Sequence, residues 1–258
     1  MLLLLSPAKS LDFDTPHAVG RPTQPQFLAQ SAELIARLKN LSVAEVASLM
    51  DLSESLATLN VGRFGLWSEK ATAKNSKPAV LAFNGDVYDG LQAATLSADD
   101  LAWAQQHVAI LSGLYGVLRP LDRLQPYRLE MGTALTTPKG KNLYAFWGDL
   151  LADHLNERLA RERDPVIVNL ASQEYFKVVD RPRLQHRVVE CVFEDWKGGR
   201  YKVISFFAKR ARGLMARFVI AHRLTQVKQL QRFDSDGYVF VAEASTTDRL
   251  VFRRRLAD

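Results

Sequence analysis

A segment near the C-terminus concentrates the positive charge of this protein. Residues 196–233 contain ten basic residues and no aspartate or glutamate. The basic residues are Lys197, Arg200, Lys202, Lys209, Arg210, Arg212, Arg217, Arg223, Lys228 and Arg232. The formal net charge of the chain is +6, so removing this +10 leaves −4 for all other residues. We predict an anion-binding surface here, with phosphate as the preferred anion. The alternative is a solvated face of an amphipathic helix, the usual role of charge runs.

Short polar clusters follow five apolar stretches of the chain, and several of them are basic. They occupy residues 6–9, 84–90, 112–116, 169–175 and 208–213. Ligands of open α/β sheets bind beyond the carboxyl ends of the strands, so parallel neighbours would bring these clusters to one cleft. The alternative is that such loops are polar in any protein. The predicted nucleic-acid-binding residues of this basic cleft are Lys9, Arg119, Arg128, Lys177, Lys209, Arg210 and Arg212.

Four polar residues near the predicted cleft would suit catalysis. Lys9, Asp86, Tyr88 and Glu130 could act on a nucleotide or nucleic-acid substrate, and an enzyme of that kind is the alternative function. The competing interpretation is that the carboxylates only balance the cleft arginines. The sequence contains no P-loop, no G-x-G-x-x-G after a strand and no G-x-S-x-G motif. No catalytic residue is therefore assigned, and a binding protein is favoured over an enzyme.

Metal and cofactor binding find little support in the residue pattern. The five histidines are scattered without H-x-x-x-H spacing, and Cys191 is the only cysteine. Iron sequestration is disfavoured as a function because soft or imidazole ligands are not clustered. We expect neither a metal nor a cofactor.

The periodicity of apolar residues predicts a mixed α/β protein with a central sheet and surrounding helices. Strands are expected at 2–5, 79–83, 108–111, 166–170, 187–193 and 200–207, with a closing hairpin at 238–243 and 250–254. Helices are expected at 27–38, 42–50, 53–59, 97–107, 147–161 and 208–224. The two helices at about 42–64 are similar to a helix-hairpin-helix, although the usual hairpin glycines are replaced by Asp51 and Ser53. A plain helical hairpin is the alternative.

Length and composition indicate a single globular domain over residues 1–258, with the helical hairpin at about 42–64 as an optional sub-lobe. Hydrophobic residues make up 47% of the chain and charged residues 24%, which is ordinary for a globular protein. The four leucines at the N-terminus are too few for a signal peptide, and no stretch is long enough to span a membrane. A single cysteine fits a reducing compartment, so we expect a cytoplasmic protein.

Seven segments in order resemble the YaaA peroxide-stress protein family over nearly the whole chain. They are SPAK at 6–9, FNGDVYDGL at 83–91, LSGLYGVLRPLD at 111–122, QPYRLEMG at 125–132, FWGD at 146–149, NLASQEYFK at 169–177 and AKRARGLMARF at 208–218. The resemblance implies a bacterial cytosolic protein that protects against hydrogen peroxide by lowering reactive iron and limiting DNA damage. It also implies an unusual mixed α/β fold with a positive cleft, a helix-hairpin-helix and affinity for DNA. Asn84 stands where the family is expected to have lysine, so one cleft charge is absent here.

The sequence therefore predicts a peroxide-stress protein that binds duplex or distorted DNA in a basic cleft. Contacts to phosphates position a protein on DNA and carry little sequence information, so we expect binding to be largely independent of sequence.

Overall fold

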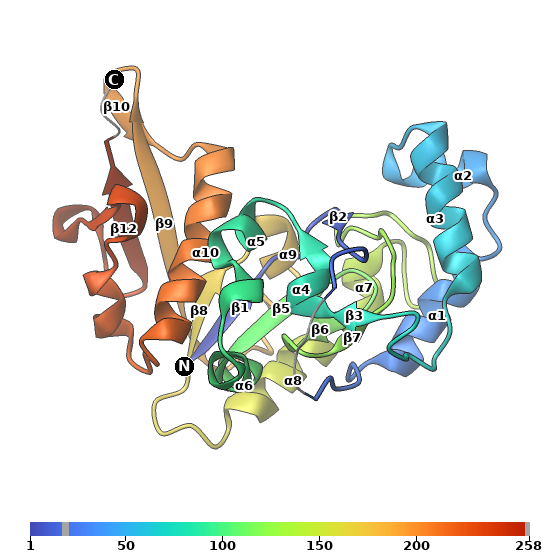
Figure 1. The fold of residues 1–258 in the computed structure, drawn as a ribbon, viewed down its shortest axis with the longest axis horizontal. Helices are drawn as coiled ribbons and strands as arrows, with labels where there is room; N and C mark the ends of the chain where they lie inside the picture. Colours follow the sequence, from blue (N-terminus) through green and yellow to red (C-terminus); the bar gives the residue numbers. More distant parts are fainter. Residues whose placement is uncertain (17–20, 256–258) are drawn as a thin grey trace.

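A computed structural model describes residues 1–16 and 21–255 and shows a central sheet with helices on both faces and at its ends (Figure 1). The sheet has eight strands in the order β11-β12-β9-β8-β1-β5-β6, with β10 paired to β9. The parallel strands are β1 (Leu2–Leu5), β5 (Val108–Ser112), β8 (Val166–Leu170), β9 (Arg187–Lys197) and β12 (Arg249–Arg254). The antiparallel strands are β6 (Gly116–Leu118), β10 (Arg200–Lys202) and β11 (Val239–Phe240). The predicted mixed α/β fold with a central mixed sheet is confirmed.

The middle of the sheet consists of the most continuous apolar runs. Every residue of β1, β5 and β8 is buried. Helices cover both faces of these strands, so they carry apolar residues without polar alternation, as parallel strands usually do. Two small sheets flank the central one. They pair β2 (Ser10–Leu11) with β4 (Phe83–Asn84), and β3 (Lys77–Pro78) with β7 (Arg123–Leu124).

Ten α-helices surround the sheet within the described residues. They are α1 (Leu28–Leu38), α2 (Val43–Met50), α3 (Glu54–Leu66), α4 (Ala79–Ala82), α5 (Asp86–Leu91), α6 (Ala98–His107), α7 (Leu143–Trp147), α8 (Leu150–Leu159), α9 (Gln173–Phe176) and α10 (Ser205–Ala221). Four short 3₁₀ segments lie at Ala93–Thr95, Val227–Arg232, Ser235–Gly237 and Ala242–Ala244. Capping boxes at Ser42 and Ser97 begin α2 and α6, at the starts expected for the helices 42–50 and 97–107.

Helices α2 and α3 form a hairpin at one end of the molecule, far from β12 (Figure 1). The turn between them is made by Asp51 in the left-handed conformation, with φ of 50°. Residues 42–62 contain no lysine or arginine. The helical hairpin is confirmed, and its assignment as a helix-hairpin-helix stays a prediction.

Several predicted elements differ from the structure in type or extent. For example, the helix expected at 53–59 continues to Leu66 as α3, and the strand expected at 187–193 continues to Lys197 as β9. Residues 79–82 form helix α4 where a strand was expected, because a short apolar run fits a buried helical turn equally well. The strand expected at 200–207 ends at Lys202, and α10 already begins at Ser205. The helix expected at 147–161 begins only at Leu150 as α8, because Trp147 ends α7 and Gly148, whose φ is 50°, separates the two helices.

Within residues 1–16 and 21–255, no helix is both long and apolar enough to cross a membrane.

Candidate functional site

A cavity of about 430 Å³ lies beyond the carboxyl ends of β1 and β8. We call it the cleft. It is lined by residues 6–10, residues 84–88, Glu130, Ser172, Glu174, Tyr175, Lys209 and Arg212. Five segments that are far apart in the sequence therefore meet at one place. All five polar clusters were expected there, and four of them line the cleft together with Glu130. The fifth cluster, 112–116, makes the turn between β5 and β6 and does not line the cleft.

The position of the cleft follows from the path of the chain through the sheet. From β1 the chain crosses to β5 on one side, and from β8 it continues to β9 on the other side. These two adjacent strands thus form a switch point, where the connections diverge and leave a crevice. Leu5 and Leu170 are in register at its edge, and the Ser172 amide donates a hydrogen bond of 2.8 Å to Ser6 Oγ just beyond it.

Two glycines allow α5 and α10 to approach each other at one side of the cleft. A Cβ atom on Gly90 would overlap the Arg210 carbonyl oxygen, and one on Gly213 would overlap the Val87 carbonyl oxygen. The two helices therefore pack backbone against backbone, which only glycine permits. This contact holds Lys209 and Arg212 of α10 beside the loop that carries Asp86.

Glu130 lies on the opposite side of the cleft and is held by two cations. Arg128 donates to its Oε1 from Nη2 at 2.9 Å and from Nε at 3.1 Å, and Lys9 Nζ lies 3.3 Å from the same oxygen. A Cβ on Gly113 would overlap the Leu129 carbonyl oxygen, so this glycine lets the Glu130 segment lie against the turn after β5. The carboxylate is thus neutralised from within the site.

The remaining charges of the cleft are only partly paired. Lys209 Nζ lies 3.8 Å from Asp86 Oδ2, and Glu174 accepts a hydrogen bond of 2.9 Å from the Gly132 amide. Arg212 has neither a hydrogen bond nor an ion pair with any side chain or backbone group that the structure describes. Burial lowers the pKa of the Arg212 guanidinium, opposed by the charge of Glu190. Arg212 is therefore a desolvated cation with free donors.

The cleft is mixed in charge rather than uniformly basic, which departs from the expectation. Three cations (Lys9, Lys209 and Arg212) line it together with three carboxylates (Asp86, Glu130 and Glu174). The carboxylates come from other parts of the chain than the basic segment, as in the competing interpretation that carboxylates near the cleft balance its cations.

Tyr88 is a structural residue of the cleft. Its hydroxyl donates a hydrogen bond of 3.0 Å to the Ser6 carbonyl oxygen, and burial raises the pKa of Tyr88 well above its usual value. The phenol is therefore protonated at all ordinary pH values and ties the 84–88 loop to the end of β1. The catalytic role considered for Tyr88 does not fit this position.

Four of the seven predicted binding residues lie outside the lining of the cleft. Arg119 pairs with Asp122 at 3.0 Å and borders a different cavity. Arg128 contacts the cleft only through Glu130. Lys177 Nζ lies over the ring of Tyr144, 4.9 Å from its centroid, and Arg210 Nε lies 3.8 Å from Asp236. Lys9, Lys209 and Arg212 remain as the predicted residues that the fold brings together.

Other cations of the basic segment are bound to distant parts of the chain. Arg217 donates to the carbonyl oxygens of Leu91 and Gln92 at the end of α5, at 3.0 and 3.2 Å. Arg223 pairs with Asp100 of α6 at 2.8 Å. The segment therefore does not present ten free charges on one surface.

Ser6, Ser172 and Glu174 belong to the polar clusters 6–9 and 169–175, which were expected at the cleft, and they line it. Ser10 also lines the cleft but lies outside the predicted clusters, because it belongs to the short strand β2 that follows residues 6–9.

Neither a metal cluster nor a reactive thiol is found in the described part of the chain. No group of three or more histidine, cysteine, aspartate and glutamate side chains there is arranged to hold a metal ion. Burial raises the pKa of the Cys191 thiol to about 12. That thiol is protonated at neutral pH and shielded from solvent.

Known sequences of the same length resemble this chain closely. The family model for peroxide stress protein YaaA matches residues 1–244. A UPF0246 protein of Bordetella petrii is 65% identical over 255 residues, covering 99% of this chain and 100% of its own. UPF0246 proteins of Albidiferax ferrireducens and Bordetella pertussis are each 64% identical, covering 99% and 100% of this chain and 98% and 100% of their own. The chain therefore belongs to the YaaA family of peroxide stress proteins.

Proposed function

We propose that this peroxide-stress protein acts in the cytoplasm by binding the phosphates of DNA at the cleft, which limits iron-driven oxidative damage to the bound DNA. The observation that carries the proposal is the convergence of Lys9, Lys209 and Arg212 at the switch point of the sheet. Their donors face a cavity that opens at the site where α/β sheets commonly bind ligands.

The three cations differ in what they can contribute to phosphate binding. The side chains of Lys9 and Lys209 are 65% and 52% exposed, so each can leave its carboxylate partner and reach a phosphate at the mouth of the cleft. Arg212 is more deeply buried and has free donors. The carboxylates oppose binding less than their number implies, because Arg128 holds Glu130 and the Gly132 amide holds Glu174.

This arrangement gives a measurable expectation for DNA binding. Each phosphate contact on duplex DNA contributes about −0.9 to the slope of log K against log salt concentration. Three contacts therefore give a slope of roughly −3, which corresponds to a salt-sensitive and sequence-independent interaction.

The test is a titration of single-stranded, duplex and branched DNA at several salt concentrations. We expect Lys9→Gln combined with Lys209→Gln to weaken binding equally on unrelated sequences and to flatten the duplex slope by about two units. The matched control is Lys197→Gln combined with Arg200→Gln, which removes two charges of the same basic segment outside the cleft. If the cleft variant keeps its affinity and slope, the proposal is wrong.

Protection against iron chemistry needs its own measurement. We expect wild-type protein to reduce strand breakage of plasmid DNA by ferrous iron and hydrogen peroxide, and the cleft variant to protect less at equal protein concentration. If both proteins protect the plasmid equally, the protection does not depend on DNA binding at the cleft, and this part of the proposal is wrong.

The hairpin of α2 and α3 is part of the proposal as a helix-hairpin-helix contact to the DNA backbone. Because residues 42–62 carry no basic side chain, this contact depends on the backbone amides of the turn near Asp51 and Ser53. Asp51→Lys should tighten DNA binding if the turn lies against phosphates. An unchanged affinity would exclude the hairpin from the interface.

The balance of charge in the cleft favours a second candidate function, an enzyme acting on a nucleotide or nucleic-acid substrate. A cavity of about 430 Å³ with three cations and three carboxylates has the size and polarity of a small-molecule site. Asp86 and Glu130 are its candidate acid and base. An enzyme would lose turnover but not affinity in Asp86→Asn or Glu130→Gln, whereas a binding protein shows no turnover in either form.

A further inference from the structure

Arg158 on α8 has a buried guanidinium nitrogen without a partner. Its Nη2 donates to the carbonyl oxygens of Gln105, Gln106 and Val108 at 3.1, 3.1 and 3.0 Å, which satisfies the C-terminal end of α6. Its Nη1 makes no hydrogen bond, and it is the one buried side-chain nitrogen or oxygen in residues 1–16 and 21–255 without a partner. Buried polar groups are nearly always hydrogen-bonded, so this atom calls for an explanation.

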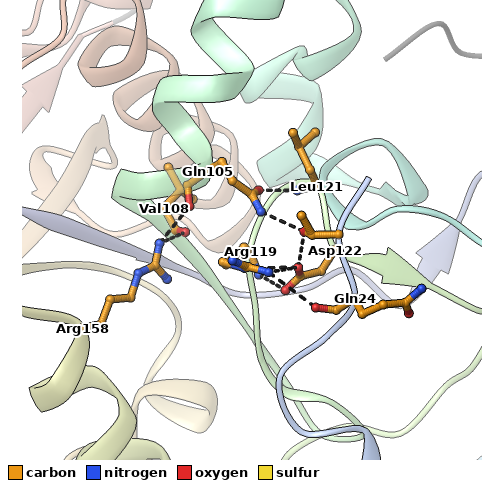
Figure 2. A network of polar contacts seen from close by, with 8 residues as sticks. Gln24, Gln105, Val108, Arg119, Leu121, Asp122 and Arg158 are labelled. Atoms are coloured by element: carbon orange, nitrogen blue, oxygen red, sulfur yellow. Dashed lines mark hydrogen bonds and ion pairs between the residues drawn. The ribbon is translucent and has the colours of Figure 1, made fainter. Parts of the chain in front are cut away.

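The unpartnered nitrogen belongs to a residue that lines a cavity of about 330 Å³ between α6, α8 and the loop after β6. We call it the Arg158 cavity. Arg119 lies beside Arg158 in Figure 2, bound to Asp122 through Nε at 3.2 Å and Nη2 at 3.0 Å. Gln105 and Asp122 are buried, whereas Gln26 and Glu157 are exposed at the mouth. The cavity thus has a closed polar floor and an open rim.

Two arginines (Arg119 and Arg158) and two carboxylates (Asp122 and Glu157) line the Arg158 cavity, but neither carboxylate pairs with Arg158. Burial and the nearby Arg119 lower the pKa of Arg158 to about 10, and burial with both arginines lowers the pKa of His154. Asp122 offsets this positive charge, but it is already engaged. It accepts hydrogen bonds from the Arg119 side chain, from the Arg119 amide at 2.8 Å and from Thr23 Oγ1. No carboxylate of the described chain pairs with Arg158.

From this geometry we infer that the Arg158 cavity binds a small tetrahedral oxyanion, either phosphate or the phosphate group of a small metabolite. Guanidinium groups are the preferred ligands of phosphate because their planar donors match its oxygens. Arg158 Nη1 is the buried donor without a partner, and Arg119 adds a second positive charge, which Asp122 offsets. Gln26 adds an amide group at the rim, whereas the amide of Gln105 is already bonded to Thr23 Oγ1 and to the Leu121 amide.

The proposed site is separate from the cleft and does not depend on the proposed function. The cleft lies beyond the carboxyl ends of β1 and β8, whereas Arg158 contacts Val108 at the amino end of β5. Because β1 and β5 are parallel, the two cavities lie toward opposite ends of the sheet. No residue lines both.

The test uses inorganic phosphate as the probe on the full-length protein. Thermal unfolding and calorimetric titration should show saturable phosphate binding, compared with sodium chloride at equal ionic strength and with acetate as a carboxylate. We expect Arg158→Lys, which keeps the charge and loses Nη1, to weaken phosphate binding about tenfold. Arg161→Gln is the matched control, because it removes a nearby exposed charge outside the cavity.

A second pair of variants avoids the helix-capping role of Arg158. Gln26→Glu should weaken phosphate binding about threefold, and Gln26→Lys should strengthen it by a similar factor, since both change only the rim charge. Short duplex DNA should not displace the phosphate, which distinguishes a free phosphate site from a contact to nucleic acid. The inference is overturned if phosphate does not bind, or if its affinity is the same in wild type, Arg158→Lys and both Gln26 variants. It is also overturned if acetate binds equally well or if duplex DNA displaces the phosphate.

Discussion

The contact between α5 and α10 predicts that Gly213→Ala will destabilise the protein. A Cβ atom at position 213 would lie 2.8 Å from the Leu91 amide nitrogen and would overlap the Val87 carbonyl oxygen. Both neighbours are backbone atoms of α5, so no side-chain rotation can relieve the contact. The helices must separate or shift along each other.

The expected magnitude follows from two opposing effects. Alanine favours a helix over glycine by about 1 kcal/mol, and overpacking a filled interface costs about 1–3 kcal/mol or more. Because the obstruction here is backbone, we expect a net loss of about 2 kcal/mol or more. A chain of this length loses about 2–4 °C of melting temperature per kcal/mol, so Tm should fall by about 4–8 °C.

A glycine elsewhere in the chain supplies the matched control. Gly65 lies inside α3, and a Cβ atom there would have no atom within 4 Å. Gly65→Ala should therefore raise the stability by up to about 1 kcal/mol through helix propensity alone. Unfolding in urea, followed by circular dichroism, measures both variants. If Gly213→Ala is as stable as Gly65→Ala, the close packing of α5 against α10 is wrong.

Two further predictions concern titratable groups. Because the Cys191 thiol is buried with a pKa of about 12, hydrogen peroxide should leave it unmodified in the folded protein and oxidise it only after unfolding, as mass spectrometry would show. Hydrogen bonds from Thr15 and the Lys77 ammonium lower the pKa of Asp12 from 3.8 to about 2, so its ionised form adds stability above pH 4 that is lost as the pH falls toward 2. The stability difference between wild type and Asp12→Asn should thus be constant from about pH 5 to 7 and shrink below pH 4 in urea titrations. We expect about 1 kcal/mol or less, because solvent screens a surface carboxylate. A difference that grows on acidification would contradict this.

The sequence predicted the helices and strands that are determined by neighbouring residues. The capping boxes at Ser42 and Ser97 need only four consecutive residues, and both begin helices in the structure. The strands β1, β5 and β8 were recognised because each is a short run of mainly apolar residues. The apolar run at 79–82 could be buried either as a strand or as a helical turn, so the sequence alone did not identify it. In the structure it forms helix α4.

The sequence left open whether carboxylates balance the cations of the cleft, and it could not give the individual pairs, because the partners are distant in the sequence. Lys209 meets Asp86, and Lys9 meets Glu130, each across more than a hundred residues. A composition taken over one segment counts the cations without these carboxylates. Arg119 is a different case, because its partner Asp122 is only three residues away and both line a different cavity.

The segments that carry the family resemblance line both cavities: most of them contribute to the cleft, and one contributes to the Arg158 cavity. The segments 6–9, 83–91, 125–132, 169–177 and 208–218 contribute to the cleft, and 111–122 contributes Arg119 and Asp122 to the Arg158 cavity. Segment 146–149 supplies Trp147, whose indole donates a hydrogen bond of 3.1 Å to the Gly113 carbonyl oxygen. Gly113 in turn lets the Glu130 segment approach the cleft. The turn after β5 therefore supports the cleft, and the strand that follows it leads to Arg119. A disturbance at Trp147 should accordingly affect both sites, whereas Arg158→Lys should leave DNA binding at the cleft unchanged.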